Sequence, residues 1–251
     1  MFGLLTLTKR EIHRFLRIWK QTLLPPVITT FLYLMIFWKF IWEKIWEIWN
    51  VDYINFIFPG LIMMAVIINS YGNSSSSFFW GKFQRSIEEL FVSPMSTTAI
   101  LLWYVFWAMT RWILIWFLVL ITWFFMTDIT IHSYFYMILF LILTSALFSL
   151  AGLFNAIFAK SFDDVNVIPS FVITPMIYLG WVFYSIDFLS PFWQSVSQFN
   201  PILYMVNGLR YAFIGQSDIN IFIAIAISVV FIIILTLLNL HFLKKWYGIK
   251  S

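Results

Sequence analysis

Residues 54–96 read INFIFPGLIMMAVIINSYGNSSSSFFWGKFQRSIEELFVSPMS, an apolar run that passes abruptly into a charged block. No charged side chain occurs from residue 54 until Lys82. A helix of about 20 apolar residues crosses the hydrocarbon core of a bilayer, so we predict a transmembrane span over 54–77. The block that follows ends at Pro94 and is too charged to enter the bilayer.

The composition extends this interpretation to the whole chain. Of its 251 residues, 62% are hydrophobic and only 10% are charged, and the mean hydropathy is +0.91. A soluble domain has about 25% charged residues, so these residues cannot cover a surface that faces water. We therefore predict an all-α polytopic membrane protein.

The apolar runs predict six transmembrane spans. They cover 23–41, 54–77, 99–126, 134–158, 167–187 and 220–243. Pro59 and Pro175 lie inside the second and fifth spans, where we expect kinks because proline removes a helical hydrogen bond. No soluble domain is visible, so we predict a single membrane domain over 1–251.

The basic residues predict the orientation. Most of the 15 lysines and arginines flank the spans on one face. They are Lys9, Arg10, Arg14, Arg17, Lys20, Lys82, Arg85, Lys160, Lys244, Lys245 and Lys250. The opposite face has Lys39, Lys44 and Arg210. Cytoplasmic loops carry the excess of Lys and Arg, so we predict that both termini are cytoplasmic. This distribution explains the net charge of +4 without a nucleic-acid partner.

Two further segments are amphipathic or apolar without being spans. Residues 8–20 have apolar side chains at helical spacing among basic ones, which predicts an amphipathic helix on the cytoplasmic surface. That helix is either a simple anchor or a lever joined to the first span. Residues 190–218 are too apolar for a hydrated loop, and the run from Pro201 is too short to cross. We expect a re-entrant or interfacial segment there.

The charged block itself predicts a short cytoplasmic helix over 82–92. Its apolar stripe consists of Phe83, Ile87, Leu90 and Phe91. Arg85 faces Glu88 and Glu89 across one turn, and Pro94 ends the helix. A helix this short is marginal alone in water, so it rests either on the lipid surface or on a protein partner. The acidic pair favours a protein, because an anionic leaflet would repel it.

Four stretches together resemble a known family. They are FPGLIMMAVIINSYGNSSSSFF (58–79), KFQRSIEELFVSPMS (82–96), AGLFNAIFAKSFDDVNVIPSFVITPMIYLGWVFYS (151–185) and PFWQSVSQFNPILYMVNGLRYAF (191–213). In this order they resemble the permease subunits of type-2 ABC transporters, the ABC-2 family, and especially inner-membrane permeases of proteobacteria. The resemblance covers essentially the whole chain.

The resemblance implies a type V exporter-like permease fold with a defined partner. In that family the loop after the second span is a coupling helix, which docks in a groove of a separate ATPase subunit. Carried over by position, the docking residues are Phe83, Arg85, Ile87, Glu88, Glu89 and Leu90. Residues 8–20 correspond to the family's connecting helix, and 191–214 to its re-entrant extracytoplasmic helices. Two permease subunits surround a path lined chiefly by spans two and five, in the bacterial inner membrane.

The sequence has no phosphate loop, because Gly81-Lys82 lacks the earlier glycine and is followed by Phe83. We therefore expect ATP and Mg²⁺ to bind in the partner chain, and no cofactor in this one. The absence of cysteine excludes disulfides and thiolate metal sites, and the three histidines have no ligand spacing.

Polar residues within the spans are candidates for the translocation path. Asn69, Tyr71, Asn73 and Ser74 end the second span, and Tyr178 and Tyr184 lie in the fifth. The alternatives are helix packing for the first group and aromatic packing for the tyrosines. Arg111 is an intramembrane charge, with either a hydrogen-bonding role or a role in the path. Asp163 and Asp164 precede the fifth span, and we interpret them as a helix cap rather than an ATPase contact.

These observations predict the permease subunit of an ABC exporter that works by alternating access and catalyses no reaction itself. The substrate class stays open among lipids, polysaccharides and hydrophobic compounds. The alternative is a stand-alone channel or membrane scaffold, which would have no ATPase partner.

Overall fold

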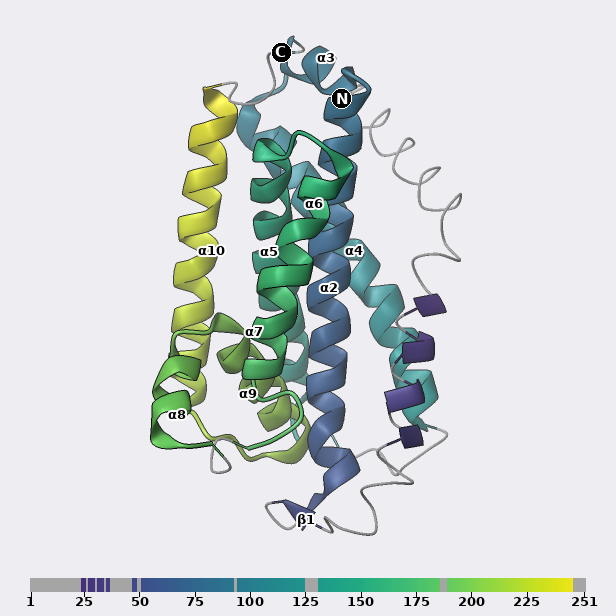
Figure 1. Cartoon of the computed structure of the whole chain (residues 1–251), viewed down its shortest axis with the longest axis vertical. Coiled ribbons are helices and arrows are strands. Elements are labelled where there is room, and N and C mark those ends of the chain that lie inside the picture. Colours follow the sequence, from purple (N-terminus) through teal and green to yellow (C-terminus); the bar gives the residue numbers. More distant parts are fainter. Residues whose placement is uncertain are drawn as a thin grey trace.

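The computed structural model describes residues 24–25, 27–29, 31–33, 35–36, 47–48, 51–92, 94–124, 131–185 and 189–245 (Figure 1). Its helices are α2 (Tyr53–Phe83), α3 (Ser86–Val92), α4 (Thr97–Phe124), α5 (Tyr134–Phe158), α6 (Phe162–Ile168), α7 (Thr174–Leu179), α8 (Pro191–Gln198), α9 (Pro201–Ile214) and α10 (Ile221–Lys244). A π-helical segment, η1 (Pro169–Ile173), joins α6 to α7. Two short strands, β1 (Glu47–Ile48) and β2 (Val51–Asp52), form an antiparallel pair that the all-α prediction did not include.

The long helices run side by side, with α2 and α5 at the centre (Figure 1). Among the described helices, these two form the most extensive pair. Gly152 of α5 explains how closely they approach, because a Cβ atom at this position would overlap the backbone oxygen of Tyr71 in α2. Small residues allow such backbone contact between membrane helices, where dispersion forces rather than the hydrophobic effect hold helices together.

Three helices in the described ranges are long and apolar enough to cross a membrane: Asn55–Phe83, Tyr134–Phe158 and Ile221–Lys244. They correspond to predicted spans two, four and six. The described residues between Leu24 and Ile36 are helical and fall within predicted span one. The structure therefore has the helices of a multi-pass membrane protein, while the count of six spans stays a prediction.

The predicted fifth span is a continuous helical run with an altered middle. It begins earlier than expected, at Phe162, and consists of α6, η1 and α7. At η1 the backbone N–H of Thr174 donates to the oxygen of Pro169, five residues earlier. Two prolines lack N–H groups here, so the ordinary α-helical pattern cannot be completed. The π segment begins at Pro169, and Pro175 follows it in the first turn of α7.

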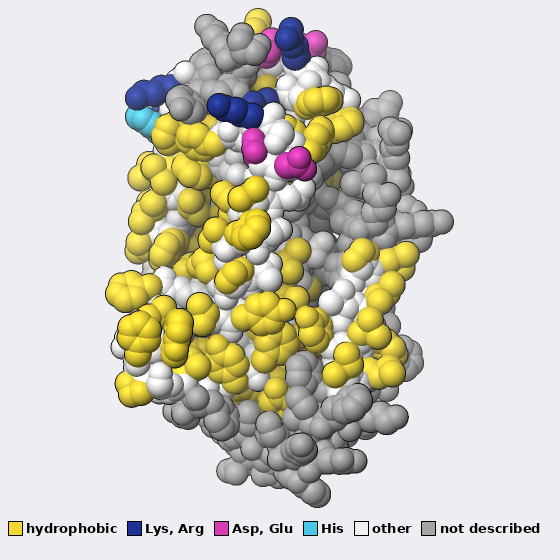
Figure 2. Space-filling model, in the orientation of Figure 1, with side chains coloured by type: hydrophobic (Ala, Val, Ile, Leu, Met, Phe, Trp, Pro, Cys, Tyr) yellow, Lys and Arg dark blue, Asp and Glu magenta, His cyan; other side chains and the backbone are white. Residues whose placement is uncertain are grey.

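On the face that Figure 2 shows, the coloured charged side chains gather at one end of the molecule. In the orientation of Figure 1 this is the end that holds α3, the connection from α5 to α6, and the last turn of α10. One hydrophobic cluster joins these elements through Ile87 of α3, Ala159 after α5 and Leu243 of α10. Below this end, the side chains that Figure 2 colours are hydrophobic. We call this region the charged end; its position on the cytoplasmic side stays a prediction.

Candidate coupling site at the charged end

The segment after α2 differs from the single helix expected over 82–92. Lys82 and Phe83 complete α2, a turn follows, and α3 begins only at Ser86. Arg85 has a positive φ of 57° in this turn. Its N–H donates to the oxygen of Lys82 (3.0 Å), and its own oxygen accepts from the N–H of Glu88 (3.2 Å). A left-handed residue at this point redirects the chain, so α3 folds back onto the bundle.

The inner face of α3 packs against this chain. Ile87 is only 1% exposed and lies in a cluster with Tyr104 of α4 and Ile157 of α5. Leu90 and Phe91 pack against the same cluster. Most of the predicted apolar stripe therefore packs within this chain. This packing stabilises a seven-residue helix that would not be stable alone.

The outer face of α3 and the preceding turn are free of this packing. Phe83 is 63% exposed, and Arg85 and Glu89 are also exposed. Glu88 and Leu90 are half-buried. Of the six predicted docking residues, Phe83, Arg85 and Glu89 are thus exposed, while Ile87 anchors α3; their docking role stays a prediction.

Aromatic rings extend this outer surface toward α6. Phe83 lies 5.2 Å from Phe162 and 6.1 Å from Trp80, measured between ring centroids. Phe162 also contacts the buried Phe79 edge to face at 4.9 Å. The surface beside α3 therefore includes both the end of α2 and the start of α6.

Lys82 connects α2 to α5. Its Nζ donates to the backbone oxygens of Ile157 (2.9 Å) and Ala159 (2.7 Å), where α5 ends. The last carbonyl groups of a helix have no N–H partner within that helix, and a cation suits the negative end of the helix dipole. The sequence analysis used Lys82 only to predict orientation and did not predict this role.

The start of α6 has the predicted cap. Asp164 Oδ2 accepts from the N–H groups of Lys160 (2.8 Å) and Ser161 (3.0 Å), and the N–H of Asp164 donates to Ser161 Oγ (3.1 Å). This reciprocal arrangement is a capping box. The N–H groups of Lys160 and Ser161 hold the pKa of the Asp164 carboxyl below its usual value. The capping interpretation of Asp164 is confirmed.

Comparison with known proteins places this arrangement in a family. Residues 3–214 match the family described as ABC-2 type transporter. The chain belongs to the ABC-2 type transporter family. It is also 47% identical over 242 residues to the inner membrane transport permease YadH of Escherichia coli K12, covering 96% of this chain and 94% of that one. The permease YadH of Shigella flexneri shows the same identity and coverage.

A more distant relative matches part of this ABC-2 chain. Nodulation protein J of Rhizobium leguminosarum bv. viciae is 24% identical over 103 residues, which is 41% of this chain and 40% of that protein. The resemblance seen in the sequence is confirmed by the family match and by the YadH permeases. The protein is a membrane permease of the ABC transporter class.

Within this ABC-2 subunit, the predicted path residues of α2 do not share one environment. Tyr71, Asn73 and Ser74 are buried, and Asn73 Nδ2 donates to the oxygen of Trp107 in α4 (3.3 Å). Asn69 is half-buried, and its Nδ2 donates to the oxygen of Ala65 one turn earlier (2.8 Å). The positions of the three buried residues fit the packing alternative.

The fifth span of this ABC-2 chain has an exposed face that carries polar side chains. Asn166, Ser170, Thr174 and Tyr178 are exposed and follow one another at intervals of four residues. Residues at this spacing share one face of a helix. Tyr184 supports the end of that face, because its hydroxyl donates to the oxygen of Tyr178 (2.8 Å). The spacing of these four residues was a sequence signal that the predictions overlooked.

Two predicted sites lie outside what the structure describes. The helix expected over 8–20 falls on residues that are not described. Arg111 belongs to α4, but its side chain is outside the described part of the chain, so its role stays a prediction. Within the described ranges, no three histidine, aspartate or glutamate side chains are grouped to hold a metal ion.

The segment expected to re-enter over 191–214 forms two helices, α8 and α9, at the end opposite α3 (Figure 1). Asn200 separates them: its Oδ1 accepts from the N–H of Ile202 (3.0 Å), and its Nδ2 donates to the oxygen of Met176 (2.6 Å). Gly215, with a φ of 79°, ends α9. These contacts pack α9 against the rest of the subunit.

Arg210 of α9 is the residue that sequence reasoning missed most clearly. Its side chain is 0% exposed, although it was counted as a loop charge. The guanidinium donates to the oxygens of Trp181 (2.7 Å) and Phe56 (3.4 Å) and lies over the Phe56 ring at 3.8 Å. Asp218 is its ionic partner at 4.0 Å. An arginine in the middle of a short apolar run was the available signal.

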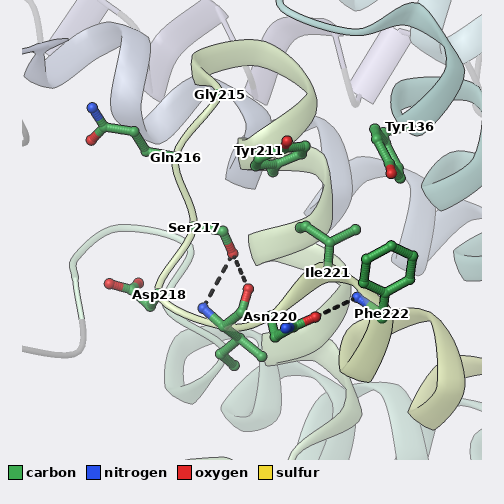
Figure 3. Close-up of a pocket in the computed structure, with 10 residues that line it drawn as sticks. Tyr136, Tyr211, Gly215, Gln216, Ser217, Asp218, Asn220, Ile221 and Phe222 are labelled. Atoms are coloured by element: carbon green, nitrogen blue, oxygen red, sulfur yellow. Dashed lines mark hydrogen bonds between the residues drawn. The ribbon is translucent and has the colours of Figure 1, made fainter.

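A cavity of about 650 Å³ lies beside this region, between the start of α5, the end of α9 and the start of α10 (Figure 3). Tyr136, Tyr211 and Phe222 supply its aromatic walls. Ser217 Oγ donates to the oxygen of Ile219 (2.8 Å), and Asn220 Oδ1 accepts from the N–H of Phe222 (2.9 Å). Because these polar groups stabilise the loop and the helix start, we regard the cavity as part of the fold.

Proposed function

We propose that this chain is the membrane-spanning permease subunit of an ABC exporter, driven by a separate ATPase subunit that docks at the charged end. The observation that carries the proposal is the position of α3, which Ile87 anchors to the bundle while Arg85 and Glu89 face outward. Membership of the ABC-2 type transporter family supports it, because an ABC transporter requires an ATPase.

The docking surface consists of Phe83, Arg85 and Glu89, with Leu90 and Glu88 at its edge. An exposed aromatic ring between charges of both signs suits a protein groove better than a lipid surface. The chain has no phosphate loop, so ATP and Mg²⁺ bind in the ATPase. Docking holds α3 to the ATPase, and α3 is joined to α2 by only a short turn.

The transporter contains two copies of this chain, with a path between them that opens alternately to each side of the membrane. The exposed polar face of the fifth span, with Asn166, Ser170 and Thr174, supports a role in lining that path. Its cargo is a lipid, a polysaccharide or a hydrophobic compound. The names of the YadH relatives place those proteins in the inner membrane, which supports the same location for this chain.

The test is co-purification of a tagged chain from membranes in mild detergent. We compare the native chain with the double variant Glu88→Lys/Glu89→Lys, and with Gln216→Lys as a matched control. Gln216 is exposed at the opposite end of the molecule, so its replacement introduces a lysine without touching α3.

We expect an ATPase subunit to co-purify with the native chain and with the control, and to be lost from the double variant. Retention by all three chains would show that docking does not depend on α3. Failure of all three to retain an ATPase would favour a channel or scaffold without such a partner.

A further inference from the structure

The contacts of Lys82 join two chain segments at the charged end. Lys82 is in the last turn of α2, and its ammonium binds the final carbonyl groups of α5, at Ile157 and Ala159. Both acceptors are backbone atoms at one helix end. The two bonds therefore fix the end of α2 to the backbone of α5, and not to a side chain that could move independently.

The end of α5 is in turn fixed to the start of α6. Asn155 of α5 is buried, and its Nδ2 donates to the oxygen of Val165 in α6 (3.0 Å). The capping box of Ser161 and Asp164 fixes the intervening turn. Phe79 of α2 packs on Phe162 of α6 at 4.9 Å between centroids. The ends of α2, α5 and α6 therefore form one block, which we call the corner block.

The docking helix is attached to the same corner block. Only Gln84 and Arg85 separate α2 from α3, and Ile87 of α3 packs in one cluster with Ile157 and Val165. A displacement of α3 by a docked partner must therefore move the corner block or break these contacts. The covalent connection passes the movement to α2. The Lys82 bonds, together with the packing of Ile87 and of Phe79 on Phe162, extend it to α5 and α6.

The fifth span then offers a place where this movement is absorbed. From α6 the helix continues without interruption into η1 and α7. At η1 the hydrogen bonds reach five residues back, and Pro169 and Pro175 remove N–H donors on either side. Such π segments interrupt the regular hydrogen-bond ladder of a helix and are frequent at functional sites. Bending at η1 would change the direction of the exposed polar face.

We propose that Lys82 is the positioning residue that transmits the movement of α3 to the fifth span, with η1 as the hinge. The inference rests on the proposed function, because the movement comes from a docked ATPase. According to this inference, the movement reaches α6 through the bonds between the Lys82 side chain and the backbone of α5. The family resemblance, by contrast, implies only that the coupling helix docks.

The test is hydrogen–deuterium exchange on the complex of this chain with its ATPase, in the nucleotide-free state and after trapping with ATP and vanadate. Exchange is followed separately in residues 86–92, which report docking, and in residues 162–174, which report α6 and η1. The variants are Lys82→Met and Lys82→Gln, which cannot bridge both carbonyl groups, and Lys82→Arg, which keeps a long cationic donor.

In the native complex we expect nucleotide trapping to change exchange in both segments. In Lys82→Met and Lys82→Gln the change over 86–92 should persist and the change over 162–174 should be lost, while Lys82→Arg restores it. A merely structural role would alter exchange equally in both nucleotide states. If Lys82→Met does not assemble, Lys82→Gln provides the comparison.

Two results would overturn the inference in different ways. A change over 162–174 that persists in both Lys82→Met and Lys82→Gln would show that the movement takes another route, with docking intact. The absence of any nucleotide-dependent change over 86–92 in the native complex would instead overturn the proposed function, and the inference with it.

Discussion

The two ends of this molecule use arginine in opposite ways. At the charged end Arg85 is exposed in a turn, and its side chain is available to a partner. At the opposite end Arg210 is completely buried and binds backbone oxygens of α2 and of the segment after α7. A buried charge is costly unless it is paired, so its partners must be held in place. The charged end therefore leaves its arginine exposed, whereas the α9 end holds its arginine in a fixed arrangement.

Replacing the buried charge of Arg210 is the most direct test of this difference between the two ends. In Arg210→Met the oxygens of Phe56 and Trp181 lose their donor, and Asp218 loses its ionic partner. Breaking a buried pair costs about 3–5 kcal/mol of folding free energy. We expect a large fall in the thermal midpoint in detergent. Arg210→Lys should recover only part of the loss, since an ammonium is a point donor without a planar fork. A midpoint unchanged in Arg210→Met would refute the assignment.

The second prediction concerns the anchor of α3. Ile87→Ala removes a fully buried side chain, a change that costs roughly 2–5 kcal/mol. If the charged end is a separable unit, the effect should be local. Hydrogen exchange over 86–92 should rise strongly, while exchange over α9 stays unchanged. Val92→Ala is the control, because Val92 is 79% exposed. A rise in exchange throughout the molecule would show that the two ends are one cooperative unit.

The third prediction concerns the packing of α2 on α5, which connects the two ends. In Gly152→Ala the new Cβ meets the backbone oxygen of Tyr71, which cannot move without shifting α2. Overpacking of this kind costs about 1–3 kcal/mol. Gly72 of α2 is the matched control, since nothing lies within 4 Å of a Cβ added there. We expect Gly72→Ala to be neutral or slightly stabilising. Thermal midpoints of the two variants should therefore differ clearly; equal values would contradict the close packing of α2 on α5.

The smallest expected effect is at the cap of α6. Ser161→Ala removes one half of the capping box and should cost about 1 kcal/mol, seen as faster exchange in the first turn of α6. The pKa of Asp164 is lowered in the folded state. Its contribution is therefore complete above the unfolded-state pKa and is lost as the pH falls through the folded-state value. Protection of this turn, corrected for the pH dependence of intrinsic amide exchange, should fall on acidification in the native chain and less so in Asp164→Asn.

Hydropathy predicted the long helices well because their ends coincide with changes from polar to apolar residues. The span predicted over 134–158 coincides with α5, and the span predicted over 220–243 differs from α10 by one residue at each end. In both cases an apolar run begins directly after a polar residue that precedes the helix, Ser133 or Asn220. The cap at Asp164 was also predictable, since it depends only on residues within one turn.

The misjudged features depend on contacts between segments far apart in the sequence. The positive φ of Arg85 divides the helix expected over 82–92, and no glycine marks this position. Helical periodicity does not reveal which face of a helix meets its neighbours. Ser74 is therefore buried while Ser76, two residues later, is exposed. Arg210 was taken for a loop charge because counting Lys and Arg assumes that residues between spans face water.

The contacts of Arg210 also have a consequence for the order in which the protein is made. Its acceptors Phe56 and Trp181 precede α9 in the chain, and Asp218 follows soon after it. A ribosome therefore delivers two acceptors to the membrane before the arginine itself emerges. Both acceptors can thus be in place before the charge of α9 has to be buried.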